Sequence, residues 1–203
     1  MKARSVGLPK ERFVAMSIIE TRFIDKRIDY SGRELRSHFV REVSGIKVDG
    51  VVAFIGACNV SGDSLVDLED SEAGDFIESA EMLSFIGEHF GVPIVEANLR
   101  LRLFASIVKD VLEELTDHLS ISREGDDLFV DDAKLTVAIS TVSPVSSLFH
   151  FGINIDPSGA PVRAAGLGEL GIDPRKAAEL VLGRYSDECK SIELAVRKVR
   201  GTL

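Results

Sequence analysis

Three stretches of the chain place apolar residues every third or fourth position, which is the spacing of one face of a helix. We therefore predict helices over residues 35–45, 76–90 and 95–117. Asp75 and Glu78 form a capping box ahead of the second helix, while Gly45 and Gly91 supply ends for the first two. The third stretch is the most hydrophobic of the three, so we expect it to be the core helix.

Other stretches have the length and the alternation of β-strands. Residues 51–60, VVAFIGACNV, predict a buried strand in which Gly56 marks either a bulge or a close approach of another group. Residues 22–30 form a short strand-like run closed by Ser31 and Gly32. After residue 117 the period changes to two, which predicts strands over 126–131, 134–141 and 145–155.

The last three strands each have one apolar and one small, polar face. We expect them to be neighbours in one sheet, with helix 95–117 packed against the apolar side chains Leu135, Val137, Phe149 and Phe151. The opposite face then presents small and hydrogen-bonding side chains, as ligand pockets commonly do. The sequence therefore predicts a pocket on this polar face.

The two ends of the chain differ in character. Residues 1–20 lack periodicity and are expected to be an extension of a single domain whose core spans 21–203. Near the other end, Asp173 and Pro174 are an N-cap and a first helical residue, so one or two helices should close the chain. We interpret Arg197, Lys198 and Arg200 as complements to the helix dipole, with a basic binding patch as the alternative. The fold class predicted is α+β, with a mixed, largely antiparallel sheet and helices mainly on one face.

Charge and composition narrow the classes of partner. The 203 residues carry a formal net charge of −9, which disfavours nucleic acid as a partner. No apolar run reaches the length of a membrane span, and Cys58 and Cys189 lack the spacing of metal ligands, so we expect free thiols, no metal site and a cytoplasmic protein. An acidic cluster can hold a hard cation, but the pattern of a calcium loop is missing, so we interpret this one as a solvated loop. Its members are Asp67, Glu69, Asp70 and Glu72.

Several segments in a fixed order resemble a known enzyme family. These are REGDDLFVDDAKLTVAI at 123–139, HFGINID at 150–156 and AAGLGELGID at 164–173, set between helices. Together they are similar to the catalytic core of biotin and lipoate protein ligases, a fold related to class II aminoacyl-tRNA synthetases. The chain also resembles an uncharacterised archaeal and bacterial family through GRELRSHF, VAFIG, VDLED and SPVSSLFHFGIN.

The ligase resemblance implies roles for particular residues. The ligases activate a carboxylic acid with ATP and transfer the acyl group to a carrier protein, so a cation is needed where negative charge forms. By resemblance that cation is Lys134, with Asp127 near the ligand and Asn154 in the later strand. From the residues alone, Lys134 can also be an exposed lysine after a hairpin, Asp127 a turn residue, and Asn154 a partner of backbone groups.

Further candidates rest on residue type. His150 on the polar face is either a general acid or base or a histidine hydrogen-bonded within the sheet. Ser143 and Ser146 are either hydroxyls of a binding loop or ordinary turn residues. Arg102, through a bidentate contact with a carboxylate, and His38 are further candidates for the ligand-binding set, if their helices point them into the pocket.

Two departures from the ligase pattern bear on the reaction. No loop rich in Gly and Arg precedes the core helix, and between Gly91 and Val95 there is no room for the strand pair that carries it in the ligases. Val137 also replaces a glycine of the family pattern. The sequence predicts a protein that binds a small carboxylic acid or acyl compound and leaves two functions open. One is an acyltransferase or acyl-adenylate enzyme related to the ligases, with the use of ATP undecided; the other is a non-catalytic binding or assembly module. In either case we expect a homodimer.

Overall fold

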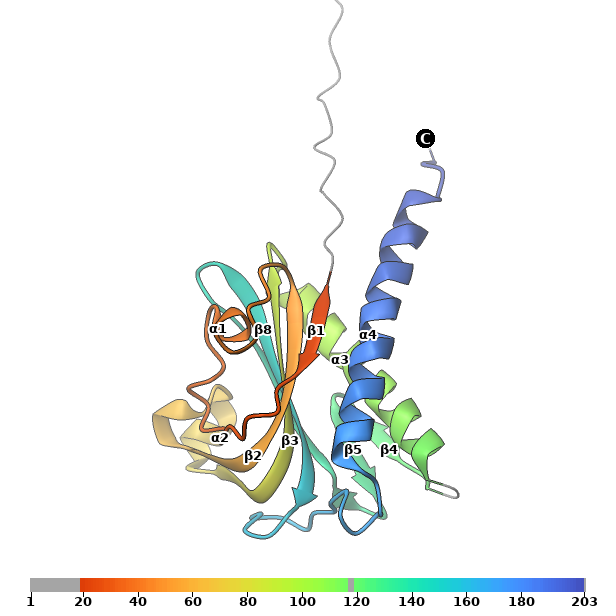
Figure 1. Ribbon diagram of the computed structural model, residues 1–203. Coiled ribbons are helices and arrows are strands. Elements are labelled where there is room, and N and C mark those ends of the chain that lie inside the picture. The colour runs from red at the N-terminus through yellow and green to blue at the C-terminus, as the bar shows by residue number, and fades with distance from the viewer. Residues whose placement is uncertain (1–18, 117–118, 203) are drawn as a thin grey trace, which may run out of the picture.

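The computed structural model describes residues 19–116 and 119–202, which form long helices on a central sheet (Figure 1). The strands are β1 (Glu20–Phe23), β2 (Gly50–Ser61), β3 (Phe76–Phe90), β4 (Ser122–Glu124), β5 (Asp127–Val130), β6 (Ala133–Lys134), β7 (Thr136–Val142) and β8 (Ser146–Asp156). The helices are α1 (Phe39–Ser44), α2 (Leu68–Ala73), α3 (Ile94–Leu115) and α4 (Pro174–Arg197), with a 3-10 turn, η1, at Gly62–Ser64.

The central sheet is mixed and largely antiparallel, which confirms the predicted fold class. Its strand order is β1-β2-β3-β8-β7, and only β1 runs parallel to its neighbour. A separate small sheet has the order β4-β5-β6. The long helices α3 and α4 lie together on one face of the central sheet, and the short α1 and α2 lie on the other (Figure 1).

The face under α3 and α4 carries the main hydrophobic core. Five buried aromatic rings meet there with centroids between 5.1 and 6.2 Å apart, in tilted and edge-on contacts: Phe85, Phe104, Phe149, Phe151 and Tyr185. The predicted core helix is thus confirmed as α3. The C-terminal prediction is confirmed as well, because Asp173 caps the single helix α4 by accepting a hydrogen bond from the Lys176 N–H.

The prediction of a helix over residues 76–90 is wrong, because this segment is strand β3. It pairs with β2 on one side and β8 on the other, and from Met82 to His89 it is buried on both faces. A strand buried on both faces loses its alternation of apolar and polar residues, and its apolar positions then match a helical stripe by coincidence. Gly87 fits the strand: a Cβ there would lie 2.1 Å from the Phe149 ring. Asp75 and Glu78 accordingly do not form a helix cap.

The prediction of three neighbouring strands in one sheet is correct for β7 and β8 and wrong for β5. β5 pairs with β4 and β6 in the small sheet. The Leu135 N–H donates to the Leu128 carbonyl and the Leu128 N–H to the Thr136 hydroxyl, so these bonds connect β5 to the start of β7. The chain passes from the small sheet to the central sheet at Leu135, so the alternation of inward and outward side chains does not continue from β6 into β7. Leu135, Phe149 and Phe151 face the helices as predicted, but Val137 pairs with Gly152 and lies on the opposite face.

Two shorter features complete the comparison. The helix predicted over 35–45 is confirmed only from Phe39, because His38 adopts a left-handed conformation with φ of 65° just before it. Both predictions for Gly56 are confirmed. The β2–β3 register shifts beside it, as at a bulge, and another segment approaches closely, since a Cβ there would lie 1.9 Å from the Ile28 carbonyl oxygen. Of the predicted strand over 22–30, only Arg22 and Phe23 belong to β1, and Tyr30 returns as an isolated bridge to Cys58.

Candidate functional site

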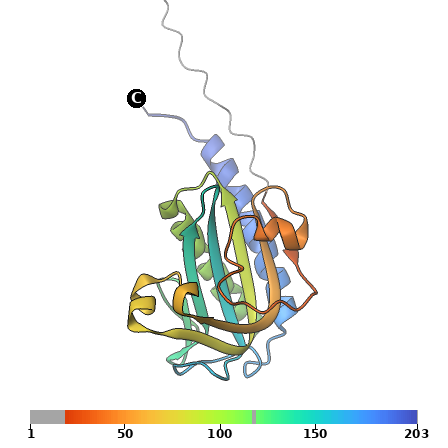
Figure 2. The same cartoon turned by 90° about the vertical axis from the view of Figure 1, so that its left-hand side faces the viewer.

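A cavity of about 650 Å³ lies on the sheet face away from α3 and α4. Figure 2 shows this face from the front, with α1 and the segment before it over one side and α2 over the other. The apolar floor combines side chains from β2, β3, β7 and the turn before α2: Val60, Leu65, Ile77, Val137 and Ile139. The loop after β8 closes one end with Ala160, Pro161 and Val162.

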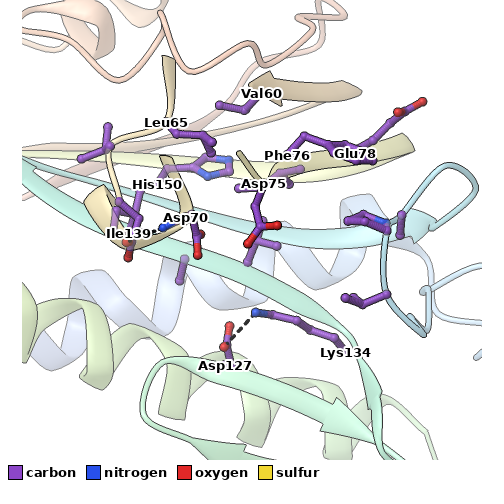
Figure 3. Close-up of a pocket in the computed structure, with 18 of the residues that line it drawn as sticks. Val60, Leu65, Asp70, Asp75, Phe76, Glu78, Asp127, Lys134, Ile139 and His150 are labelled. Atoms are coloured by element: carbon purple, nitrogen blue, oxygen red, sulfur yellow. Dashed lines mark hydrogen bonds and ion pairs between the residues drawn. The ribbon is translucent and has the colours of Figure 1, made fainter. Parts of the chain in front are cut away.

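The segment between β2 and β3 supplies an acidic wall to this pocket. Asp67 is the N-cap of α2, because its carboxylate accepts hydrogen bonds from the Glu69 and Asp70 N–H groups. This cap begins α2, and Asp70 on it lines the pocket together with Asp75. Figure 3 shows the carboxylates of Asp70 and Asp75 directed into the same space. Burial, followed by repulsion from Asp67 and Asp75, raises the pKa of the Asp70 carboxyl, an effect that Lys134 partly offsets.

Lys134 enters the pocket from the opposite wall, at the end of β6. Its Nζ lies 2.9 Å from Oδ2 of Asp127 on β5, and each of the two side chains is 32% exposed. The pairing of β5 with β6 holds both residues in place, because Phe129 lies opposite Lys134 in the register. Figure 3 shows the Lys134 ammonium directed at Asp127, with Asp70 and Asp75 across the space above it. Lys134 is the one Lys or Arg in the described lining of the cavity.

His150 and Tyr30 form the deepest polar part of the pocket. Their rings stack with centroids 3.7 Å apart and planes 8° from parallel, and they are 3% and 5% exposed. The His150 Nε2 lies 3.2 Å from the Ser84 hydroxyl. Burial lowers the pKa of His150 to about 3, so the imidazole is neutral near pH 7. Burial also raises the pKa of Tyr30, which keeps its hydroxyl protonated.

The structure brings four of the predicted site residues to this one cavity: Lys134, Asp127, His150 and Asn154. The Asn154 side chain donates to the Lys134 carbonyl at 3.4 Å, and its main chain bonds to Leu135 and Leu167, so it supports the strand as well as lining the pocket. These positions agree with the resemblance, and the roles of the residues stay predictions.

The other four predicted residues lie elsewhere. Arg102 on α3 is more than half exposed, 3.9 Å from Asp126, and does not line the cavity. Ser143 and Ser146 bond to each other in the β7–β8 turn, and the Ser146 hydroxyl also donates to Glu88. The His38 N–H donates to the same Glu88 carboxylate beside a separate cavity of about 200 Å³. Ordinary turn chemistry accounts for the contacts between the two serines, while the bond from Ser146 to Glu88 links the turn to β3.

The residues that sequence reasoning missed are Tyr30 and the carboxylates of the acidic wall. Asp67 and Asp70 were visible in the sequence but interpreted as part of a solvated loop, and Asp75 and Glu78 were interpreted as a helix capping box. The structure makes Asp67, Asp70, Asp75 and Glu78 part of the cavity lining. Tyr30 left no sequence signal, because it reaches the pocket through a bridge to Cys58, which is 28 positions away. Within the described residues, no three His, Cys, Asp or Glu side chains are grouped so as to hold a metal ion.

Comparison with known proteins assigns the chain to a family. Residues 19–200 match the model of a domain of unknown function, DUF366, and the chain belongs to this family. An uncharacterized protein of Methanocaldococcus jannaschii is 32% identical over 206 residues, covering 96% of this chain and 92% of its own. A solved structure described as a protein of unknown function from Pyrococcus horikoshi superposes with a TM-score of 0.85 at 36% identity, over 91% of this chain and 100% of that one.

A more distant likeness confirms the predicted relation of the fold. The biotin protein ligase from Aquifex aeolicus, solved in complex with biotin and ATP, matches with a TM-score of 0.54 at 19% identity. The match covers 83% of this chain and 70% of the ligase. At this level of identity the comparison concerns the fold alone. Among the described helices, none is both long and apolar enough to cross a membrane.

The β2–β3 pair corrects the expectation that there is no room for strands ahead of the core helix. These two strands directly precede α3, where the resemblance places the strand pair that carries the phosphate-binding loop of the ligases. The segment that joins them, residues 62–75, contains no Lys or Arg and six Asp or Glu residues. A phosphate chain needs backbone N–H groups or cations around it, and carboxylates repel it. The residues at this position therefore do not fit the phosphates of ATP.

Proposed function

We propose that this protein binds a small acyl compound or carboxylic acid in the 650 Å³ cavity, with the carboxyl or carbonyl oxygen at Lys134, and that it does so without ATP-driven ligation. The cavity supports this proposal because it combines an apolar floor with one cationic side chain. An aliphatic ligand would bury its chain on Val137 and Ile139 and place its polar end on the ammonium. Asp127 would hold that ammonium in position from behind, at 2.9 Å.

The alternative, an enzyme that forms an acyl adenylate, is favoured only by the likeness of the fold. The acidic segment 62–75 stands against it, because it repels the triphosphate where the ligases attract it. His150 also lacks the properties of a general base, since it is buried against Tyr30 and its pKa of about 3 makes it a very weak one. We therefore infer a binding protein that has the ligase fold.

The experiment begins with native mass spectrometry of the purified protein, to identify any ligand that is retained. Calorimetry then compares the parent with Lys134→Ala, using that ligand or octanoate as the probe. Loss of a hydrogen bond to a charged group predicts an affinity lower by about 1.5–3 kcal/mol. Lys190→Ala is the matched control, because Lys190 also makes a 2.9 Å ion pair, with Asp187, on the far side of the molecule. Equal affinities for parent and Lys134→Ala would overturn the role of Lys134.

A separate measurement tests the absence of ligation. ATP with Mg²⁺ should neither bind in the calorimeter nor release pyrophosphate in the presence of the acid. Pyrophosphate release that depends on the acid would overturn the proposal in favour of the adenylate-forming enzyme.

We infer further that the protein is a cytoplasmic homodimer. Exposed apolar side chains, including Leu99 on α3 and Ile192 on α4, border a shallow cavity of about 210 Å³ between the two long helices, and they offer a surface for a second copy. The free thiols of Cys58 and Cys189 suit a reducing compartment. Light scattering should give twice 22.1 kDa, and a mass of 22.1 kDa over a wide concentration range would contradict the dimer.

A further inference from the structure

The cavity lining carries more negative charge than a ligand with only a carboxylate would favour. One ammonium, Lys134, faces six carboxylates in the described lining: Asp67, Asp70, Asp75, Glu78, Asp126 and Asp127. Asp127 already pairs with that ammonium at 2.9 Å. An anion entering this cavity would meet an excess of negative charge, and only a positive charge elsewhere on the same ligand would compensate for it.

The positions of two carboxylates indicate where such a positive charge would lie. Asp70 and Asp75 point into the same space from α2 and from the residue just before β3, opposite Lys134 (Figure 3). No Lys, Arg or His within the described residues forms an ion pair with either of them. The Asp67 carboxylate, by contrast, is occupied as the N-cap of α2.

A second, independent observation also indicates a polar ligand. Tyr30 is 5% exposed and lines the cavity, yet in the described part of the chain nothing hydrogen-bonds to its hydroxyl. His150 is 3% exposed and uses only Nε2, toward Ser84, so its Nδ1 likewise has no bond within residues 19–116 and 119–202. Among the described residues, the one fully enclosed side-chain N or O atom without a partner is Ser140 Oγ, so the Tyr30 hydroxyl and the His150 Nδ1 are not sealed off. Both residues line the cavity, where a ligand can supply the missing hydrogen bonds.

We propose that the ligand is an amine-bearing carboxylic acid, or an acyl derivative of one, whose ammonium group is held between Asp70 and Asp75 while its carboxyl or carbonyl end lies at Lys134. This inference rests on the proposed function and names its substrate class. The apolar floor between the two charged walls, with Val137 and Ile139, receives the carbon chain that separates the two ends. The ammonium offsets the excess negative charge that would otherwise repel the carboxylate.

The probes are three matched series of four to ten carbons: ω-amino carboxylic acids, straight-chain carboxylic acids and straight-chain amines. Calorimetry measures each against the parent, Lys134→Ala, Asp70→Asn and Asp75→Asn. Glu72→Gln is the matched control, because it removes the same charge from α2 at a residue that does not line the cavity. Circular dichroism and thermal unfolding show that each variant folds.

The expected result is tightest binding by one length of ω-amino acid. Asp70→Asn and Asp75→Asn should each weaken that binding by about tenfold or more, the loss of one hydrogen bond to a charged group. Glu72→Gln should change it less than twofold. Lys134→Ala should reduce the affinity of the amino acid to that of the matched amine.

The other outcomes separate this inference from the proposed function. If carboxylic acids bind as tightly as amino acids and Asp70→Asn has no effect, the inference is overturned while the proposed function stands. If amines bind as tightly as amino acids and Lys134→Ala has no effect, the role of Lys134 fails and only the cationic site remains. Binding of MgCl₂ or CaCl₂ that needs both Asp70 and Asp75, without binding of any amine, overturns the inference in favour of a metal. No binding by any series at 10 mM overturns both.

Discussion

The two faces of the central sheet use the same strands for opposite purposes. On the face under α3 and α4, β3 and β8 contribute Phe85, Phe149 and Phe151 to a closed aromatic core. On the other face the same strands contribute Ser84, His150 and Asn154, and the short helices leave a cavity of about 650 Å³ there. The comparison suggests that stability resides on the helix face and recognition on the pocket face.

The largest effect should come from Phe104, which is fully buried at the centre of the helix-face core. Its ring contacts those of Phe85, Phe149, Phe151 and Tyr185. Phe104→Ala should lower the free energy of unfolding by about 3–5 kcal/mol, as deletion of a buried aromatic ring does. Chemical denaturation measures this, and ligand affinity should stay within twofold of the parent. If Phe104→Ala has the same free energy of unfolding as the parent, the helix face is not the main source of stability.

A matched pair of glycines tests the same comparison with a smaller change. A Cβ at Gly87 would lie 2.1 Å from Cε1 of Phe149, a ring fixed in the core, so Gly87→Ala should cost about 1–3 kcal/mol of stability. A Cβ at Gly152, on the pocket face, would lie 2.3 Å from Sδ of Met82, whose side chain is flexible, and 3.0 and 3.1 Å from Val137 Cγ2 and His150 Cε1. Gly152→Ala should therefore cost less than Gly87→Ala, about 1 kcal/mol. Equal losses in denaturant melts would mean that the two faces are equally rigid.

A third prediction concerns how stability depends on pH through a residue of the pocket face. The pKa of His150 is about 3 in the folded chain, against about 6.5 when unfolded. As the pH falls below 6.5, the unfolded chain takes up a proton that the folded chain refuses, so stability decreases, by up to about 1.4 kcal/mol per pH unit. His150→Gln should remove this slope between pH 6 and 4, since other titrating groups are common to both proteins. Parallel stability curves for parent and variant would show that His150 is protonated when folded.

The helix face was also the part of the fold that the sequence predicted well. The spacing of α3 and the alternation of Phe149 and Phe151 report burial on one side only, which is the situation in which periodicity is informative. The same reasoning failed for β3, because its residues from Met82 to His89 are buried on both sides.

The pocket face was predicted only in part. Lys134, Asp127, His150 and Asn154 were found through the resemblance and the polar alternation of the strands. The acidic wall was not recognised, because Asp70 and Asp75 become part of a cavity only when residues 62–75 fold back over β7 and β8 (Figure 2). The position of Tyr30 in the pocket depends on its bridge to Cys58, and that of Val137 depends on the change of sheet at Leu135. Neither feature leaves a local pattern in the sequence.

The segment that joins β2 to β3 has a further consequence for how binding specificity evolves. Helix α2 within it has no buried residue, so its side chains contribute little to the stability of the fold. Selection can therefore change the charge of this segment while the sheet and its aromatic core are retained. The resemblance places a basic, phosphate-binding loop at the same position in the ligases. Exchange of an acidic for a basic segment at one point of a common scaffold would be enough to turn a preference for anions into a preference for cations.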